Sequence, residues 1–351
     1  MTKKLLPTVI GMILAGGMAV VQADVQVMGH IDESINYIDG KNSPYVDKGD
    51  TDTRFICTTC SIGFKGSEDL GNGLKALFFL DWQYDINTSS GLDGRDQYLG
   101  LGGNFGTLKV GTMSTVYKSH GAMIDPGYRT VAQMRDVGIQ SRLHSGKGSD
   151  GQGRNTNAIR YDSPSWNGLK FGANYTVAPD SSPNGDNNGY GAGLSYENGG
   201  ILVYADYLTN DAGGDDEAYQ LGGKYTLNNF SLFGQYEIDK GLITDVNTET
   251  LGQNNTGDGA DLWFAGASYA MGNNLIYAAY AQGEKGKTRD DTIAVPPAAT
   301  DKVISDKYKS MEIVGVHNFS KRTLAYTGFV YVNPDDSSNV NHYTLGVKHT
   351  F

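Results

Sequence analysis

Residues 74–85 read LKALFFLDWQYD, with an apolar or aromatic side chain at every even-numbered position from Leu74 to Tyr84. The odd-numbered positions include the charged residues Lys75 and Asp81. This period of two is the signature of a β-strand, because successive side chains of a strand point to opposite faces. The stretch therefore predicts a strand with one apolar face and one partly polar face.

The same alternation recurs at 169–177, 219–227 and 343–351. A soluble sandwich and a membrane barrel would both show it, so alternation alone leaves both architectures open. No helical period of comparable strength accompanies it, which disfavours an α/β enzyme.

The lengths of the connections favour the barrel, because short turns alternate strictly with longer polar segments. The turns lie near 68–73, 103–106, 165–168, 198–200, 228–229, 272–274 and 320–321, and the loops near 39–53, 87–94, 115–153, 178–188, 210–216, 240–258, 284–306 and 334–339. Together they require sixteen strands. We therefore expect an all-β fold: a sixteen-stranded antiparallel transmembrane β-barrel with short periplasmic turns and long outer loops.

Composition narrows the class of protein further. The 351 residues include 48 Gly, 22 Tyr and 12 Phe, and the formal net charge is −11. Tyrosine suits a membrane–water boundary, and the many aromatic residues argue against disorder. The acidic charge argues against nucleic acid as a partner, since there is no basic stripe to bind phosphates.

The first residues have the pattern of an export signal. Lys3 and Lys4 precede an apolar stretch at 5–21 that ends in Val-Gln-Ala, a small-residue cleavage site. We interpret 1–23 as a cleaved signal peptide and 24–351 as the barrel, with a short membrane anchor as the alternative. No other apolar run is long enough to span a membrane as a helix.

Four motifs carry a resemblance to a known family. They are SIGFKGSEDLGNGLKA from Ser61, QYLGLGGNFGTLKVG from Gln97, IRYDSPSWNGLKFGANY from Ile159 and the terminal LGVKHTF. With these motifs the chain resembles the Gram-negative trimeric general porins of sixteen strands, along essentially its whole length after 23. The resemblance implies an outer-membrane homotrimer and a water-filled channel for passive diffusion of ions and small hydrophilic solutes. It also implies contacts with outer-membrane lipid, lipopolysaccharide and the barrel-assembly machinery.

In that family the third loop folds into the barrel and narrows the channel. The corresponding loop here is about 115–153, and a surface flap is the alternative. The resemblance places Asp125 and Asp136 on the loop, with fewer acidic residues than the family usually has. It places Arg95 and Arg154 on the facing wall. Arg160 shares the inward phase of Arg154, and His30 occupies an inward position of the first strand. The alternative for each of these residues is a solvated charge in the lumen with no special role.

Charge counts suggest the ion preference of such a pore. The third loop and its end contain six basic residues and three acidic ones: Lys118, Arg129, Arg135, Arg142, Lys147 and Arg154 against Asp125, Asp136 and Asp150. Selectivity is set at the narrowing, because screening mutes charges that lie more than about 8 Å away. We therefore predict a weak anion preference in spite of the acidic chain. The alternatives are a substrate-specific outer-membrane channel, a barrel enzyme and a surface adhesin.

Catalytic and cofactor motifs are missing from the sequence. There is no GxSxG, HExxH or Walker loop and no His cluster with metal-ligand spacing, so we expect no enzyme activity, no cofactor and no metal. The last residue, Phe351, ends an alternating apolar series, which in the porins resembles the signal read by the assembly machinery.

The two cysteines, Cys57 and Cys60, are separated by two residues. In a flat strand these side chains would point to opposite faces and lie too far apart to bond. A disulfide therefore needs a turn or bulge where the first loop rejoins the second strand. The oxidising compartment favours that bond over two free thiols.

Overall fold

The computed structural model describes residues 24–39, 52–88, 91–145, 153–177, 188–210, 216–243, 257–288, 307–335 and 339–351. The predicted signal peptide, 1–23, lies outside the described residues. No helix in the described part of the chain is both long and apolar enough to cross a membrane.

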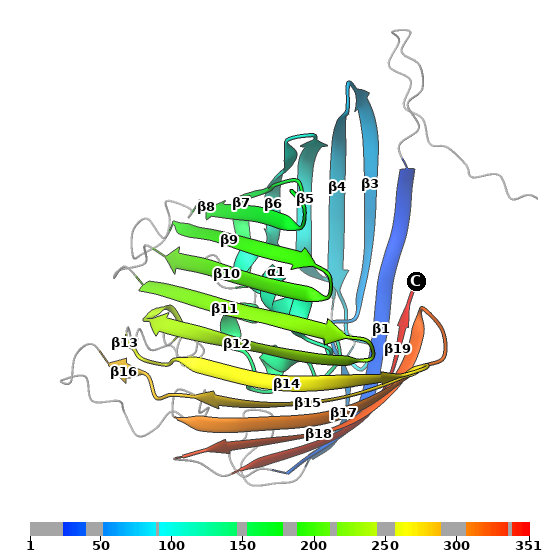
Figure 1. Ribbon diagram of the computed structural model, residues 1–351. Helices are drawn as coiled ribbons and strands as arrows, with labels where there is room; N and C mark the ends of the chain where they lie inside the picture. The colour runs from blue at the N-terminus through cyan, green and yellow to red at the C-terminus, as the bar shows by residue number, and fades with distance from the viewer. Residues whose placement is uncertain are drawn as a thin grey trace, which may run out of the picture.

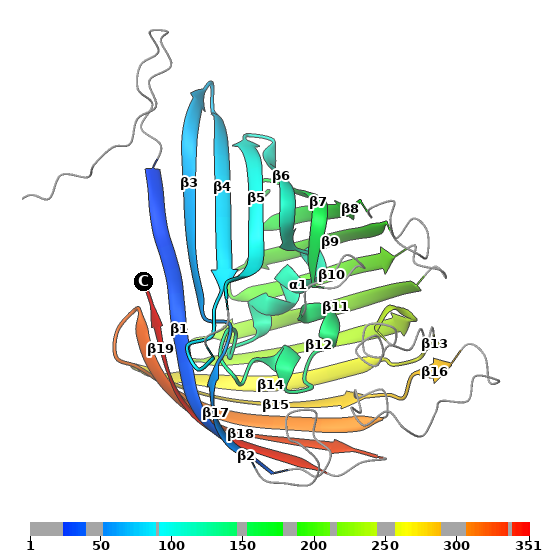
Figure 2. The same cartoon turned by 180° about the vertical axis from the view of Figure 1, so that it is seen from behind.

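Seventeen β-segments form one antiparallel sheet that closes on itself (Figures 1 and 2). They are β1 (Asp24–Asp39), β2 (Asp52–Cys57), β3 (Ser61–Gly71), β4 (Leu74–Gln83), β5 (Asp93–Gly103), β6 (Gly106–Ser114), β7 (Arg154–Asp162), β8 (Leu169–Thr176), β9 (Gly189–Asn198), β10 (Ile201–Asn210), β11 (Asp216–Leu227), β12 (Phe230–Lys240), β14 (Leu262–Met271), β15 (Asn274–Gly283), β17 (Tyr308–Asn318), β18 (Thr323–Pro334) and β19 (Val340–Thr350). The short pair β13 (Gly257–Asp258) and β16 (Lys287–Thr288) forms a separate two-stranded sheet.

The barrel has sixteen strands because β2 and β3 are two parts of one strand. Both pair with β1, Cys57 opposite Glu33 and Ser61 opposite His30. The barrel closes where β1 pairs with β19, and reciprocal backbone hydrogen bonds of 3.1 and 3.0 Å join Gly29 to Phe351. The predicted fold class is therefore confirmed.

The seven predicted short turns all connect neighbouring barrel strands. Asn167 and Gly168, between β7 and β8, have φ angles of 52° and 96°. Two consecutive positive φ values are what a tight hairpin turn requires, and Asn-Gly is the pair that adopts them most easily. The Asn-Gly sequence thus explains why the chain reverses here within a few residues.

The alternation of the sequence separates the two faces of the barrel. Outward-facing apolar residues such as Val203, Leu221 and Leu345 are 45%, 64% and 58% exposed. Their neighbours Tyr204, Gln220 and Thr344 face inward and are buried. The exposed apolar belt suits lipid, while the inward face is mixed in polarity.

The long connection after β6 lies inside the barrel (Figures 1 and 2). It contains a short helix, α1 (Val116–Gly121), and the 3₁₀ turns η1 (Ala122–Ile124), η2 (Met134–Asp136) and η3 (Arg142–His144). α1 is only six residues long. Its N-cap is Thr115, whose side chain accepts a hydrogen bond from the backbone N–H of Lys118.

Candidate functional site

The third loop packs against one wall of the barrel through an apolar cluster. Ile124, Met134, Val137 and Ile139 of the loop contact inward-facing residues of β10, β12, β14, β15, β17 and β18, among them Leu202, Phe233, Phe264, Ala281 and Val330. A second cluster joins Val131 and Ala132 to Tyr277 and Tyr326. Because the loop covers this wall, the basic residues of β5 and β7 belong to the opposite side of the lumen.

Asp81 on β4 is the counter-ion of two arginines. The Nε of Arg95 donates to Asp81 Oδ2 at 3.1 Å, and Nη2 of Arg129, from the third loop, lies 3.8 Å from the same oxygen. Arg95 also donates to Gln83 at 2.8 Å. One carboxylate thus holds a wall guanidinium and a loop guanidinium side by side.

A β-bulge places a second carboxylate beside the first. Leu80 pairs with Gln97 and Trp82 with Gly94, so Asp81 lies opposite two residues, Arg95 and Asp96. A bulge lets consecutive side chains reach the same face, which a regular strand forbids. Asp96 therefore reaches Arg154 at the start of β7, with Nε and Oδ1 2.5 Å apart.

His30 on β1 completes this group from the adjoining wall. Its Nδ1 lies 3.4 Å from both Nη1 of Arg129 and Oγ of Ser61, and its Nε2 lies 3.2 Å from Oγ1 of Thr59. The structure thus brings together four of the predicted residues, Arg95, Arg129, Arg154 and His30, around two carboxylates.

Tyr128 lies between two guanidinium groups of the loop. The Cζ atoms of Arg129 and Arg135 are 5.9 and 5.0 Å from the centre of its ring. Burial raises the pKa of Tyr128, but the positive charges of Arg135 and Arg129 outweigh burial and hold it below its usual range. Cation–π contact with Tyr128 thus holds both guanidinium groups beside one ring.

Lys118 of α1 lies beside this group and is only 4% exposed. Burial, then the positive charges of Arg135 and Arg154, hold the pKa of Lys118 well below its usual range. Burial is the larger cause of this shift, and the neighbouring positive charges act in the same direction.

Arg160 has a different position from Arg95 and Arg154. It forms an ion pair with Asp162 at 2.8 Å. It also donates to the carbonyls of Ser114 and Thr115 at 2.7 and 3.1 Å and to the hydroxyl of Ser119 at 2.7 Å. Arg160 therefore fixes the beginning of the third loop to β7.

The two predicted acids of the loop point into the loop itself. Asp125 accepts hydrogen bonds from the backbone N–H groups of Gly127 and Met134 at 2.8 and 3.1 Å. Burial raises the pKa of Asp125 to about 7, although those two bonds and Arg135 act to lower it. Asp136 accepts a hydrogen bond from Gln133 of the same loop. Neither residue joins the group around Asp81 and Asp96.

The remaining predicted residues lie elsewhere. Cys57 and Cys60 are joined by a disulfide, with Cα atoms 5.8 Å apart. The turn that allows it interrupts the second barrel strand between β2 and β3, further along than the expected site at the end of the first loop. Phe351 lies beside Gly29 at the barrel seam, and its role as an assembly signal stays a prediction. Among the described residues, no group of three or more His, Cys, Asp or Glu side chains could hold a metal ion.

Comparison with known proteins supplies the family. The profile described as Gram-negative porin matches residues 8–337. The chain belongs to the Gram-negative porin family. It is 28% identical over 344 residues to the major outer membrane protein P.IB of Neisseria gonorrhoeae, covering 91% of each chain. The protein of the same name from Neisseria lactamica is 28% identical over 358 residues, covering 98% of this chain and 99% of the relative.

Solved structures show the same fold. The anion-selective porin from Comamonas acidovorans matches with a TM-score of 0.73 and 22% identity, covering 94% of this porin and 100% of that chain. OmpF of Salmonella typhi, in complex with daunomycin, matches with a TM-score of 0.68 and 17% identity, over 93% and 97% of the two chains. The porin therefore forms a water-filled channel in the outer membrane of a Gram-negative bacterium, through which ions and small hydrophilic solutes diffuse passively.

Sequence reasoning missed two acids that matter to this geometry. Asp96 was overlooked because strand phase places it opposite Arg95, and only the bulge turns both inward. Asp206 on β10 has its Oδ1 2.7 Å from Nδ1 of His120 on the third loop. Alternation of polarity does not reveal it because both faces of its strand, ILVYADYL, are apolar. Its signal was its shared phase with Leu202 and Tyr204, which are both inward-facing and buried.

Proposed function

We propose that this porin is a weakly anion-preferring diffusion channel whose third loop forms the constriction. The observation that carries the proposal is the unequal charge around Asp81 and Asp96. Three arginines, Arg95, Arg129 and Arg154, pair with these two carboxylates. The guanidinium of Arg135 contacts the Tyr128 ring next to Arg129. The acids that could balance them, Asp125 and Asp136, form their hydrogen bonds within the loop.

Electrostatics explains why this group outweighs the acidic chain. Exposed charges beyond a Debye length of about 8 Å are largely screened at physiological ionic strength. A unit charge about 4 Å from a permeating ion changes its energy by about 1 kcal/mol even in bulk water. An excess of cations at the narrowest level therefore favours anions there. The fold likeness to a porin described as anion-selective supports the same conclusion.

A reversal potential in a KCl gradient tests the proposal. Wild-type porin is expected to favour chloride weakly. The double variant Arg95→Ala and Arg154→Ala should shift the preference several-fold toward potassium, because two cations leave the constriction. The matched control is Lys75→Ala with Lys170→Ala, which removes the same charge from inward positions of β4 and β8 beside the short turns that precede these strands. Clear potassium preference in the wild type would overturn the proposal.

The assembled state belongs to the same proposal. A solved structure of OmpT from Vibrio cholerae, described as a trimer form, matches this porin with a TM-score of 0.63. We infer a homotrimer, in contact with outer-membrane lipid and lipopolysaccharide and inserted by the barrel-assembly machinery. Strand pairing leaves the outer face of the barrel free for such contacts.

A further inference from the structure

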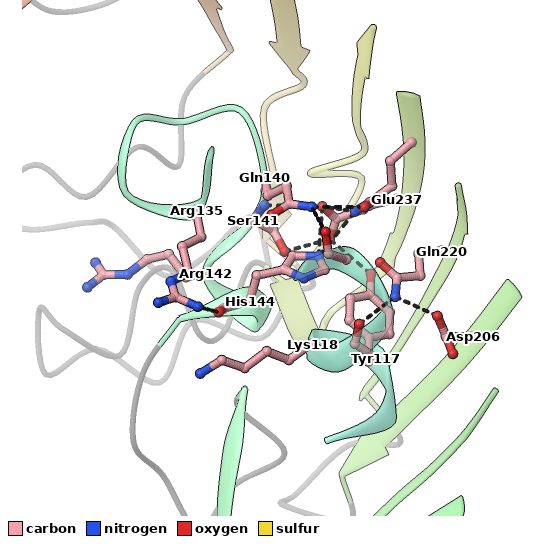
Figure 3. Close-up of polar contacts among 12 residues, drawn as sticks. Tyr117, Lys118, Arg135, Gln140, Ser141, Arg142, His144, Asp206, Gln220 and Glu237 are labelled. Atoms are coloured by element: carbon pink, nitrogen blue, oxygen red, sulfur yellow. Dashed lines mark hydrogen bonds and ion pairs between the residues drawn. The ribbon is translucent and has the colours of Figure 1, made fainter. Parts of the chain in front are cut away.

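Glu237 on β12 accepts several hydrogen bonds from the third loop, on the wall that this loop covers (Figure 3). It is fully buried, so permeating solute does not touch it. Its oxygens accept hydrogen bonds from Tyr117 Oη at 2.9 Å, from Ser141 N at 3.1 Å and from Ser141 Oγ at 2.6 Å. The ring nitrogen Nε2 of His144 lies 3.3 Å away.

These partners come from two separate parts of the loop. Tyr117 belongs to α1 at its beginning, whereas Ser141 and His144 lie at η3, more than twenty residues later. The wall side chain Gln235 supports the carboxylate, donating to Glu237 at 2.8 Å and accepting from Gln140 of the loop at 3.1 Å. Glu237 thus binds residues from both the beginning and the end of the described part of the third loop.

Directional bonds matter here because the apolar contacts are not directional. Other wall residues bond the loop singly, as Ser310 Oγ does to the carbonyl of Val137 at 2.6 Å, whereas Glu237 accepts three hydrogen bonds from the loop. The loop and the wall share a large apolar cluster, and apolar burial hardly distinguishes one lateral position from the next. Hydrogen bonds have strict distances and angles, and a buried donor left without a partner is costly. The position of the loop across the lumen is therefore set where buried donors converge on one acceptor.

We propose that Glu237 is a positioning residue for permeation: it fixes the third loop at the distance from the arginine-bearing wall that sets the aperture. The inference rests on the proposed constriction by this loop. In Figure 3, Lys118 and Arg135 extend away from Glu237, while Tyr117, Ser141 and His144 turn toward it. Glu237 thus anchors the wall-facing side of the third loop, and Lys118 and Arg135 lie on the opposite side of the same loop.

The test compares variants of full-length porin in planar bilayers and in liposomes. Glu237→Ala should raise single-channel conductance about 1.5-fold or more, admit larger neutral sugars in liposome swelling and increase current noise. Glu237→Gln keeps one acceptor oxygen for Ser141 N, so its conductance should fall between wild type and Glu237→Ala. Neutral sugars report the aperture independently of ion sign, so a wrong ion preference in the wild type would leave this test intact.

Glu312→Gln is the matched control. Glu312 lies on β17 of the same covered wall and is buried, yet neither of its oxygens has a hydrogen-bond partner among the described residues. The conductance of the Glu312→Gln variant, and the largest neutral sugar that it admits, should equal those of the wild type. Should Glu237→Ala fail to form a barrel, the loop-side pair Tyr117→Phe with Ser141→Ala removes the two hydroxyl hydrogen bonds to Glu237 without changing the wall, and should act in the same direction. Wild-type conductance and sugar limit in folded Glu237→Ala or in the loop-side pair, or equal changes in Glu312→Gln, would overturn the proposal.

Discussion

Asp125 shows how a single residue can link the third loop to pH. Its carboxyl group binds the backbone N–H groups of Gly127 and Met134, so it holds the bend of the loop closed. The groups that act on it are Arg135, which favours its charge, and Asp136, which opposes it; Glu312 and Tyr277 on the wall and Lys348 on β19 also face it. Burial outweighs the favourable terms and raises the pKa of Asp125 from 3.8 to about 7.

The sign of the pH effect follows from this raised pKa. Asp125 holds its proton more tightly in the packed loop than it would in an open loop. The packed state of the loop is therefore most stable below about pH 4 and loses this stability as pH rises through about 7. Wild-type current noise should therefore increase several-fold between about pH 5 and about pH 8. Asp125→Asn should show little change over this range, whereas Asp136→Asn, which removes the same charge from the same loop, should keep the wild-type response. Noise that is independent of pH in the wild type would contradict the expectation.

At the scale of the element, strand phase predicts much of the structure and fails for identifiable reasons. The alternation in 74–85 and 343–351 is clear because those strands face water on one side. It fades in β10 and β15, where Leu202, Tyr204 and Ala281 face inward but are covered by the loop. Asp96 illustrates the other failure, because a bulge shifts the phase by one residue and no local sequence feature announces it. Strand phase predicts that Asp81 and Glu237 face inward. It does not predict which residues of the loop contact them.

The interrupted second strand gives a prediction at the same scale. The Cys57–Cys60 disulfide closes a very short loop, so its stabilisation should lie at the low end of the usual range of about 0–5 kcal/mol. Cys57→Ser with Cys60→Ser should leave conductance unchanged and lower the unfolding temperature only slightly, because paired strands around the whole barrel dominate stability. Alkylation of denatured, unreduced wild-type protein followed by mass spectrometry should find both thiols protected; two alkylated cysteines would refute the bond.

For the whole molecule, Glu33 is a charged residue on the otherwise apolar outer face of β1. Glu33 lies between the exposed side chains of Ile31 and Ile35 on β1. Asn87 donates to its Oε2 at 3.3 Å, but its Oε1 is buried and has no partner in the described part of the chain. A charged group facing lipid is unfavourable. A neighbouring protomer that supplies a hydrogen-bond donor would satisfy this carboxylate, so we expect the face around Glu33 to be the subunit contact.

The two environments predict opposite results for Glu33→Leu. Against lipid, removing a carboxylate would stabilise the protein or leave it unchanged, because the apolar belt becomes continuous. At a subunit contact, the neighbour's donor loses its partner, which costs about 1–3 kcal/mol per protomer, and the trimer should dissociate at a lower temperature in detergent. Val203→Glu on β10, across the barrel from β1, is the control: it places a carboxylate in the belt and should reduce insertion without changing trimer dissociation. A Glu33→Leu trimer as stable as the wild type would place this face against lipid and locate the subunit contact on other strands.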